Sequence, residues 1–387
     1  MLFRSGDTER VRRTAMQSVL ATLVLGLFFT AVTLLASPFV PKWMQVAPSI
    51  RKTASRYFFI LYTPMLARTA TVIFGAVLRG VGDTRTPMLV GVAVNLLNVV
   101  LNFLLIYQTR TVQVFNRQVL IPGAGLGVTG AAIASAAAFL AGGLLITIVL
   151  FRHPLLSPKG LPLKPDFEIL KPALRVAMPN MLQRFVTSLG YVLFATMINA
   201  LGPASTAAHT IANTVESAFY IPGYGMQAAA ATRTGMAIGE GALDRLHKEH
   251  RIMLVLELIL MVLTGGTLFL LAPWLVRLFT KDPSVIRLSS TVLRMVACSE
   301  PIYGIPLIIE GFLQGAGKTR ISFVFNLIGM WGIRITGTFL CTVLFSFGLV
   351  SAWSCMILHN VMLFVMFTFF YYRRRSTLFQ DASLLLP

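Results

Sequence analysis

Long apolar stretches alternate with short polar loops along nearly the whole chain. Most of the stretches have about 20 residues or more, the length that an α-helix needs to cross the hydrocarbon core of a bilayer. Such stretches must be helical in lipid, because no water is present there to satisfy backbone N–H and C=O groups. The pattern predicts ten membrane-spanning helices, at residues 16–38, 57–80, 87–107, 127–151, 176–201, 204–232, 252–278, 286–314, 321–344 and 348–372.

Composition strengthens this prediction and excludes an ordinary soluble domain. The 387 residues are 56% hydrophobic and only 12% charged, and the mean hydropathy is +0.76. The net charge of +19 does not indicate a nucleic-acid partner, because the basic residues lie in the loops between apolar stretches. About twice as many Lys and Arg lie on the side of the two termini, which predicts cytoplasmic termini in the cell membrane. The three cysteines have no metal-ligand spacing, so we expect no metal site.

The sequence contains an internal repeat. The segment LRGVGDTRTP at residues 78–87 returns as LQGAGKTR at residues 313–320, with Leu78 and Leu313, and also Gly82 and Gly317, 235 residues apart. By this offset, the first four predicted spans match the last four, whereas the fifth and sixth have no counterpart. We therefore expect a complete form to have two halves of six spans each, of which the first two spans are missing here.

The repeated segment resembles the multidrug and toxin extrusion (MATE) family of membrane antiporters. NLLNVVLN (95–102), AAHTIANTVES (207–217) and EPIYGIPLIIEG (300–311) support the resemblance, which covers residues 6 to about 375. It implies an all-α integral membrane protein with about ten transmembrane helices, in a MATE-like bundle of two pseudo-symmetric lobes. We expect an incomplete N-terminal lobe of four helices (1–151), a cytoplasmic linker (152–175), a C-terminal lobe of six helices (176–375) and a cytoplasmic tail (376–387).

The resemblance also implies a function. Members export organic, often cationic or amphipathic, compounds in exchange for H⁺ or Na⁺, by alternating access. We therefore expect a monomeric transporter in the lipid bilayer that is not an enzyme and needs no cofactor. Two alternatives stay open: a flippase for lipid-linked oligosaccharides from the same superfamily, and an inactive truncated paralogue. A membrane-embedded enzyme is disfavoured, because no HExxH, GxSxG or paired-Asp motif lies in a predicted span.

Four of the 14 acidic residues lie inside predicted spans, all in the second half of the chain: Glu216, Glu257, Glu300 and Glu310. A carboxylate within a membrane is costly, and it can hold either a proton or Na⁺. We interpret Glu216, Glu300 and Glu310 as candidates for ion coupling. Glu257 follows a leucine-rich start, and we interpret it as structural.

Uncharged polar residues complete the candidate cavity. In the family, two polar residues four apart on one helix line the cation pocket, and here these positions are Asn98 and Asn102. Residues four apart share one helical face, and an interhelical polar clamp is the alternative interpretation. Gln183 and Tyr303 are further candidates for the substrate cavity.

Three arginines, Arg68, Arg184 and Arg334, also lie within predicted spans. They keep the flippase alternative open, because a flippase requires a more cationic cavity to meet phosphate. In an exporter of cations, unpaired arginines in the cavity would repel the substrate. We therefore expect each to be paired with a glutamate or with a helix C-terminus.

Overall fold

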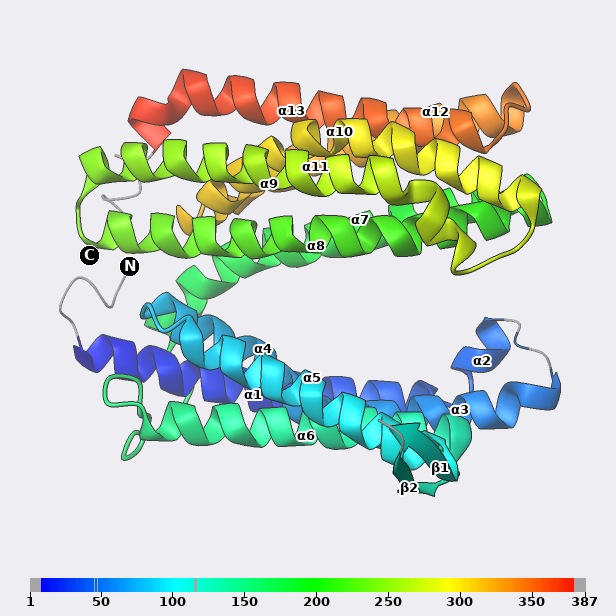
Figure 1. Ribbon diagram of the computed structural model, residues 1–387. Helices are drawn as coiled ribbons and strands as arrows, with labels where there is room; N and C mark the ends of the chain where they lie inside the picture. Colours follow the sequence, from blue (N-terminus) through cyan, green and yellow to red (C-terminus); the bar gives the residue numbers. More distant parts are fainter. Residues whose placement is uncertain (1–7, 45, 47, 115–116, 379–387) are drawn as a thin grey trace. The chain divides into compact units, whose positions relative to one another are not determined.

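The computed structural model describes residues 8–44, 46, 48–114 and 117–378. The chain forms two compact units (Figure 1). The N-terminal unit extends to Leu170, and the C-terminal unit begins at Lys171. Each unit is described by itself.

The N-terminal unit is built of helices and one pair of strands: α1 (Thr8–Ala36), α2 (Val40–Trp43), α3 (Pro48–Tyr62), α4 (Met65–Gly80), α5 (Arg85–Ile106), β1 (Gln108–Val114), β2 (Arg117–Ala124) and α6 (Gly127–Arg152). Helix α6 packs against α3, α4 and α5. The predicted span 57–80 is divided between α3 and α4, with a bend of 44°. Pro64 lies at this break, and the break is expected there because proline has no N–H for the helical hydrogen bond.

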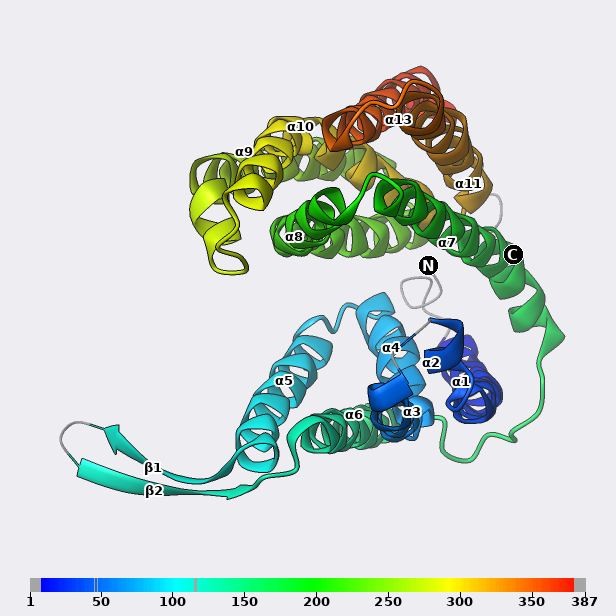
Figure 2. The same ribbon diagram turned by 90° about the vertical axis from the view of Figure 1, so that its right-hand side faces the viewer.

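The C-terminal unit contains α7 (Phe167–Asn199, whose first turn precedes the unit boundary), α8 (Pro203–Gly239), α9 (Leu243–Arg277), α10 (Pro283–Gly315), α11 (Thr319–Leu327), η2 (Ile328–Ile335), α12 (Thr336–Phe339), η3 (Leu340–Leu344) and α13 (Leu349–Leu378). Helix α10 is central, since it packs against α8, α9 and α13 (Figure 2). Its buried apolar residues contribute to both apolar clusters of the unit. The segments η2 and η3 are π-helical.

The predicted spans agree with long helices of the structure. Among the described residues, eight helices are long and apolar enough to cross a membrane, or nine when α3 and α4 count as one span. The remaining predicted span is α8, which does not pass that test although it has 37 residues. It carries a polar face with Asn213, Glu216 and Gln227, and this face lowers its hydropathy. The number of ten spans and their division into four and six stay predictions.

Residues 108–126 lie between two predicted spans, and no strand was predicted there. Strands β1 and β2 form an antiparallel hairpin there, in which Arg110 pairs with Ile121 and Val112 with Val119. The hairpin extends away from the helices of its unit (Figure 2). The alternating β-branched residues in QTRTVQV are typical of a strand, so this element could have been predicted.

The two copies of the repeat have the same local geometry. Gly82 and Gly317 both have positive φ angles, of 92° and 73°, which favour glycine at a helix C-terminus. The amide after each glycine donates back to the carbonyl of Leu78 (3.0 Å) or Leu313 (2.8 Å). Both leucines are fully buried. Each copy therefore ends its helix with the same glycine-dependent turn.

The segment between α6 and α7 is joined to α1 by hydrogen bonds. The Arg12 guanidinium donates to the carbonyl of Ser157 (3.0 Å). Gln17 donates to the carbonyl of Lys164 (2.9 Å) and accepts from the amide of Asp166 (3.1 Å). This part of the expected linker therefore packs against α1 and belongs to the N-terminal unit.

Candidate functional site

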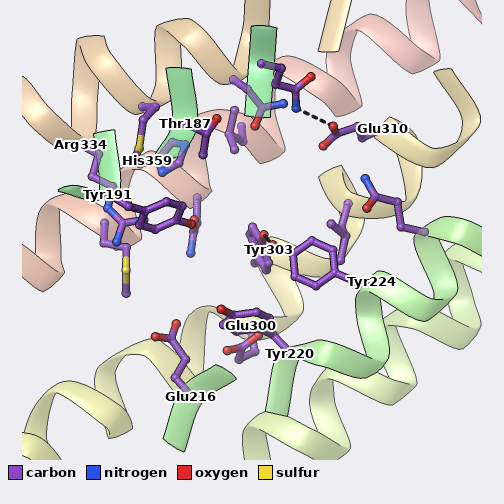
Figure 3. A pocket seen from close by; sticks show the side chains of 18 of the residues that line it. Thr187, Tyr191, Glu216, Tyr220, Tyr224, Glu300, Tyr303, Glu310, Arg334 and His359 are labelled. Atoms are coloured by element: carbon purple, nitrogen blue, oxygen red, sulfur yellow. Dashed lines mark hydrogen bonds between the residues drawn. The ribbon is translucent and has the colours of Figure 1, made fainter. Parts of the chain in front are cut away.

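A cavity of about 120 Å³ lies inside the C-terminal unit. Six elements, α7, α8, α10, α11, η2 and α13, contribute side chains to its lining, and Figure 3 shows these side chains around the cavity. The lining residues are Gln183, Arg184, Thr187 and Tyr191 of α7; Asn213, Glu216, Tyr220, Tyr224 and Gln227 of α8; Glu300, Tyr303, Leu307 and Glu310 of α10; Asn326, Met330 and Arg334 of α11 and η2; and Met356, His359, Asn360 and Leu363 of α13. Five of the residues predicted from sequence, Glu216, Glu300, Glu310, Gln183 and Tyr303, are thus brought together.

Two carboxylates, those of Glu216 and Glu300, point into the same part of the cavity, with the Tyr220 ring beside them (Figure 3). Both residues are buried, with exposed fractions of 8% and 2%. The Oε2 atom of Glu300 has no hydrogen-bond partner among the described residues. A buried carboxylate without donors favours its neutral, protonated form or a bound cation. These two residues can therefore exchange a proton for a cation without breaking a fixed ion pair.

The third carboxylate, that of Glu310, is held by amide donors. Gln183 Nε2 donates to Glu310 Oε1 at 2.7 Å, and Gln314 Nε2 donates to the same oxygen at 3.2 Å. Glu310 is ten residues from Glu300 on α10, about 15 Å along a helix. The hydroxyls of Tyr224 and Tyr303 lie between these ends (Figure 3), 3.2 Å from each other. The cavity thus has one carboxylate pair and one separate, anchored carboxylate.

The sequence analysis missed several cavity residues, although a helical pattern could have identified them. Glu216, Tyr220 and Tyr224 are four residues apart on α8, as are Gln183, Thr187 and Tyr191 on α7. Residues with this spacing share one helical face. Asn213, three residues before Glu216, lies on the same face of α8, whereas His359 gave no comparable signal.

Two of the intramembrane arginines lie over aromatic rings and form no direct salt bridge with a glutamate among the described residues, and the expected pairing with a helix C-terminus stays a prediction. Arg334 lies over the rings of Tyr191 (4.8 Å) and Phe194 (4.3 Å), and Arg68 lies over the ring of Phe139 (5.0 Å). Within the described part of the chain, neither forms a salt bridge within 4.0 Å. An aromatic face attracts a guanidinium through its quadrupole, an interaction that the expectation did not consider.

Arg184 lines the cavity, and the described residues offer it no salt bridge either.

Glu257 does not line the cavity. It is fully buried, and its two carboxylate oxygens have no hydrogen-bond partner among the described residues. A Cβ atom added at Gly304 would lie 3.2 Å from its Oε1 atom. Gly304 therefore leaves the space that the Glu257 side chain fills. The structural role of Glu257 stays a prediction.

Asn98 and Asn102 belong to the N-terminal unit. Asn102 Nδ2 donates to Asn98 Oδ1 at 3.0 Å, and Asn98 Nδ2 donates to Ser135 Oγ of α6 at 3.1 Å. The Oδ1 atom of Asn102 is buried without a partner among the described residues. These contacts support the clamp between helices, and they leave Asn102 one free acceptor for a ligand.

Comparisons with known proteins agree on one family. The sequence model of the MatE family matches residues 4–104 and 179–340. A relative from Thermotoga maritima, described as "Probable multidrug resistance protein NorM", is 29% identical over 343 residues, which cover 88% of this chain and 71% of the relative. "Probable multidrug resistance protein YoeA" from Bacillus subtilis is 23% identical over 86% of this chain and 70% of its own length.

Solved structures share the fold. "Crystal structure of MATE in the bent conformation" aligns with a TM-score of 0.85 at 22% identity, covering 98% of this chain and 81% of that chain. A second structure, described as "Reverse polarity of binding pocket suggests different function of a MOP superfamily transporter from Pyrococcus furiosus Vc1 (DSM3638)", aligns with a TM-score of 0.87 at 23% identity, covering 97% and 81%.

Proposed function

Because the chain belongs to the MatE family of multidrug efflux transporters, we propose that it exports organic cationic or amphipathic compounds in exchange for H⁺ or Na⁺. The observation that supports this proposal best is the meeting of Glu216, Glu300 and Glu310 in one cavity inside a spanning bundle. Drug-sized ligands occupy pockets of about 300–1,000 Å³. A cavity of about 120 Å³ suits a coupling ion with a few waters, or one end of a substrate.

In this proposal, a proton and a cation compete for the same carboxylates. A charged side chain at the bilayer centre costs about 2.5–3.5 kcal/mol on insertion scales, so Glu216 and Glu300 are neutralised either by protons or by a bound cation. Binding of one releases the other, and each state favours a different arrangement of the helices around the cavity. Glu310, which accepts two amide hydrogen bonds, keeps a fixed position and attracts cations to the other end.

The remaining roles follow from this assignment. Gln183 and Tyr303 contact substrate from the cavity wall, and Asn98 and Asn102 are the candidate substrate contacts of the first lobe. Residues 1–151 and 176–375 act as the two lobes, joined by the linker 152–175 and followed by the tail 376–387. The protein acts as a monomer in the cell membrane, with both termini in the cytoplasm.

The test is efflux of ethidium, an organic cation, from proteoliposomes with an imposed H⁺ or Na⁺ gradient. Glu216→Gln keeps the size of the side chain but cannot exchange a proton, so we expect gradient-driven efflux to fall at least tenfold while membrane insertion is unchanged. Glu257→Gln is the matched control, since Glu257 is also a buried carboxylate on a spanning helix but lies outside the cavity lining. Unchanged efflux by the Glu216 variant would reject this residue and shift the assignment to Glu300.

One observation supports the flippase alternative, since Arg184 and Arg334 line the cavity and could bind a lipid phosphate. A transport assay with a fluorescent lipid-linked oligosaccharide separates the two functions. The flippase alternative requires transfer of this lipid without an ion gradient, whereas the antiporter requires gradient-driven loss of ethidium. Absence of both activities would favour the inactive paralogue.

A further inference from the structure

Arg334 is a buried cation of the cavity with an unsatisfied N–H group. Its exposed fraction is 4%, and its Nε atom is buried without a hydrogen-bond partner among the described residues. The rings of Tyr191 and Phe194 attract its positive charge. A ring face cannot replace the oxygen or halide acceptors that guanidinium N–H groups require in a plane.

His359 lies beside Arg334 and is also unsatisfied. It comes from α13, its exposed fraction is 7%, and neither ring nitrogen has a partner among the described residues. A Cβ atom added at Gly329 would lie 2.6 Å from the ring, so η2 approaches α13 closely at this position. Figure 3 shows the side chains of Arg334 and His359 on the same side of the cavity.

We propose that Arg334 and His359 form a second subsite in the cavity, which binds a small monovalent anion. Arg334 supplies the charge and in-plane N–H donors, and His359 supplies an N–H from a ring nitrogen. The anion is either the carboxylate of a transported zwitterion or a free halide. The zwitterion part rests on the proposed transport function, whereas anion binding itself does not.

The acidic part of the cavity fits the cationic end of such a zwitterion. Glu216 and Glu300 provide negative charge there, and the rings of Tyr220 and Tyr224 line the same cavity. Aromatic faces attract quaternary ammonium groups. If the anion is a carboxylate of the substrate, the subsite narrows the substrate class to compact compounds in which a cationic and an anionic group are a few bonds apart.

Anion binding is measured first, with the purified chain in lipid nanodiscs. Thermal unfolding is followed while chloride or acetate replaces gluconate at constant ionic strength. We expect saturable stabilisation of the wild type, and an apparent affinity about tenfold lower or worse for Arg334→Gln, because a charge-assisted contact is lost. Arg68→Gln is the matched control, since Arg68 also lies over an aromatic ring but does not line the cavity. Equal responses of the wild type and Arg334→Gln, or no response of the wild type to either anion, would overturn the proposal.

The source of the anion is found with two small ligands that share a quaternary ammonium group. Glycine betaine carries a carboxylate and choline does not, and calorimetry gives the affinity of each in chloride and in gluconate. If a substrate carboxylate occupies the subsite, the affinity for betaine in gluconate is higher than the affinity for choline, and Arg334→Gln removes this difference. If a free halide occupies the subsite instead, choline binds more tightly in chloride than in gluconate, and this difference appears in the wild type only. If Arg334→Gln weakens both ligands equally in both salts, Arg334 is only a structural support and the proposal is wrong.

A second variant and a direct observation cover the case in which Arg334→Gln does not fold. His359→Phe keeps a ring against Gly329 and removes both nitrogens, so the affinity for chloride should fall about threefold to fivefold. Bromide, located by anomalous scattering in crystals, should lie within hydrogen-bonding distance of Arg334, and an empty subsite at saturating bromide would contradict the proposal. These measurements do not involve transport. A failure of Glu216→Gln to reduce efflux would therefore affect the proposed function and leave the anion subsite standing.

Discussion

The spanning helices of the two units carry different polar groups. In the C-terminal unit, carboxylates of α8 and α10 share a cavity with two arginines and four tyrosines. In the N-terminal unit, the polar cluster of α5 and α6 consists of Asn98, Asn102 and Ser135, which hydrogen-bond one another. Amides and hydroxyls cannot take up or release a proton near neutral pH, so the groups suited to ion coupling in these clusters lie in the C-terminal unit.

The helices that carry these groups also differ in packing, which is tighter in the C-terminal unit. In the most apolar part of α10, 61% of the residues are buried inside the structure, against 6% for α5. A charged or titrating group needs a rigid, desolvated surrounding to discriminate between ions. The tight surroundings of α10 provide this, whereas α5 presents most of its side chains outward. The following changes probe this difference, from the largest expected effect to the smallest.

A methyl group should be tolerated in α5 and not in α10. A Cβ atom at Gly311 would lie 2.6 Å from the carbonyl oxygen of Gln227, a backbone atom that cannot move alone, whereas nothing lies within 4 Å at Gly91. We expect Gly311→Ala to lower the free energy of unfolding by about 1–3 kcal/mol or more. Gly91→Ala should be neutral or slightly stabilising, because alanine favours a helix. Equal unfolding midpoints of the two variants in detergent would contradict the packing difference.

The anchored carboxylate should be more sensitive than the amide clamp. Gln183→Leu removes the shorter hydrogen bond to Glu310, and the loss of a bond to a charged group costs about 1.5–3 kcal/mol. Asn98→Leu removes neutral hydrogen bonds, each of which contributes about 0.5–1.5 kcal/mol. Thermal unfolding of both variants gives the comparison. A larger loss of stability in Asn98→Leu than in Gln183→Leu would mean that Glu310 is neutral or that its amide contacts are weak.

The smallest effect is expected at the helix starts. Asp282 caps α10 by accepting from the backbone amides of Ser284 and Val285, whereas Thr84 makes no side-chain cap bond at α5. Hydrogen bonds from the side chain and the backbone of Ser284 hold the pKa of Asp282 below its ordinary value. The cap therefore stabilises the fold above about pH 4 and loses this effect as the pH falls through the lowered pKa. Asp282→Asn should remove this pH dependence, and Thr84→Ala should change nothing; an unchanged acid profile of the Asp282 variant would argue against the cap.

The sequence predicted the helices and much of the cavity for a physical reason. Long apolar stretches can only be helices in lipid, and a carboxylate such as Glu216 is costly enough there to indicate a function. What could not be predicted depends on three-dimensional packing. The position of Arg334 over two rings requires knowledge of which helices are neighbours, and the π-helical turn that carries it has no simple sequence signature.

Proton release on cation binding tests most directly whether ion exchange resides in the cavity of the C-terminal unit. Sodium gluconate or choline gluconate is added to the purified chain in lightly buffered solution, and the pH change is recorded. The wild type and Asn98→Leu should release protons in a saturable manner, because the cation displaces protons from Glu216 and Glu300. The double variant Glu216→Gln, Glu300→Gln should release none. Undiminished release by the double variant, or loss of release in Asn98→Leu, would contradict the account.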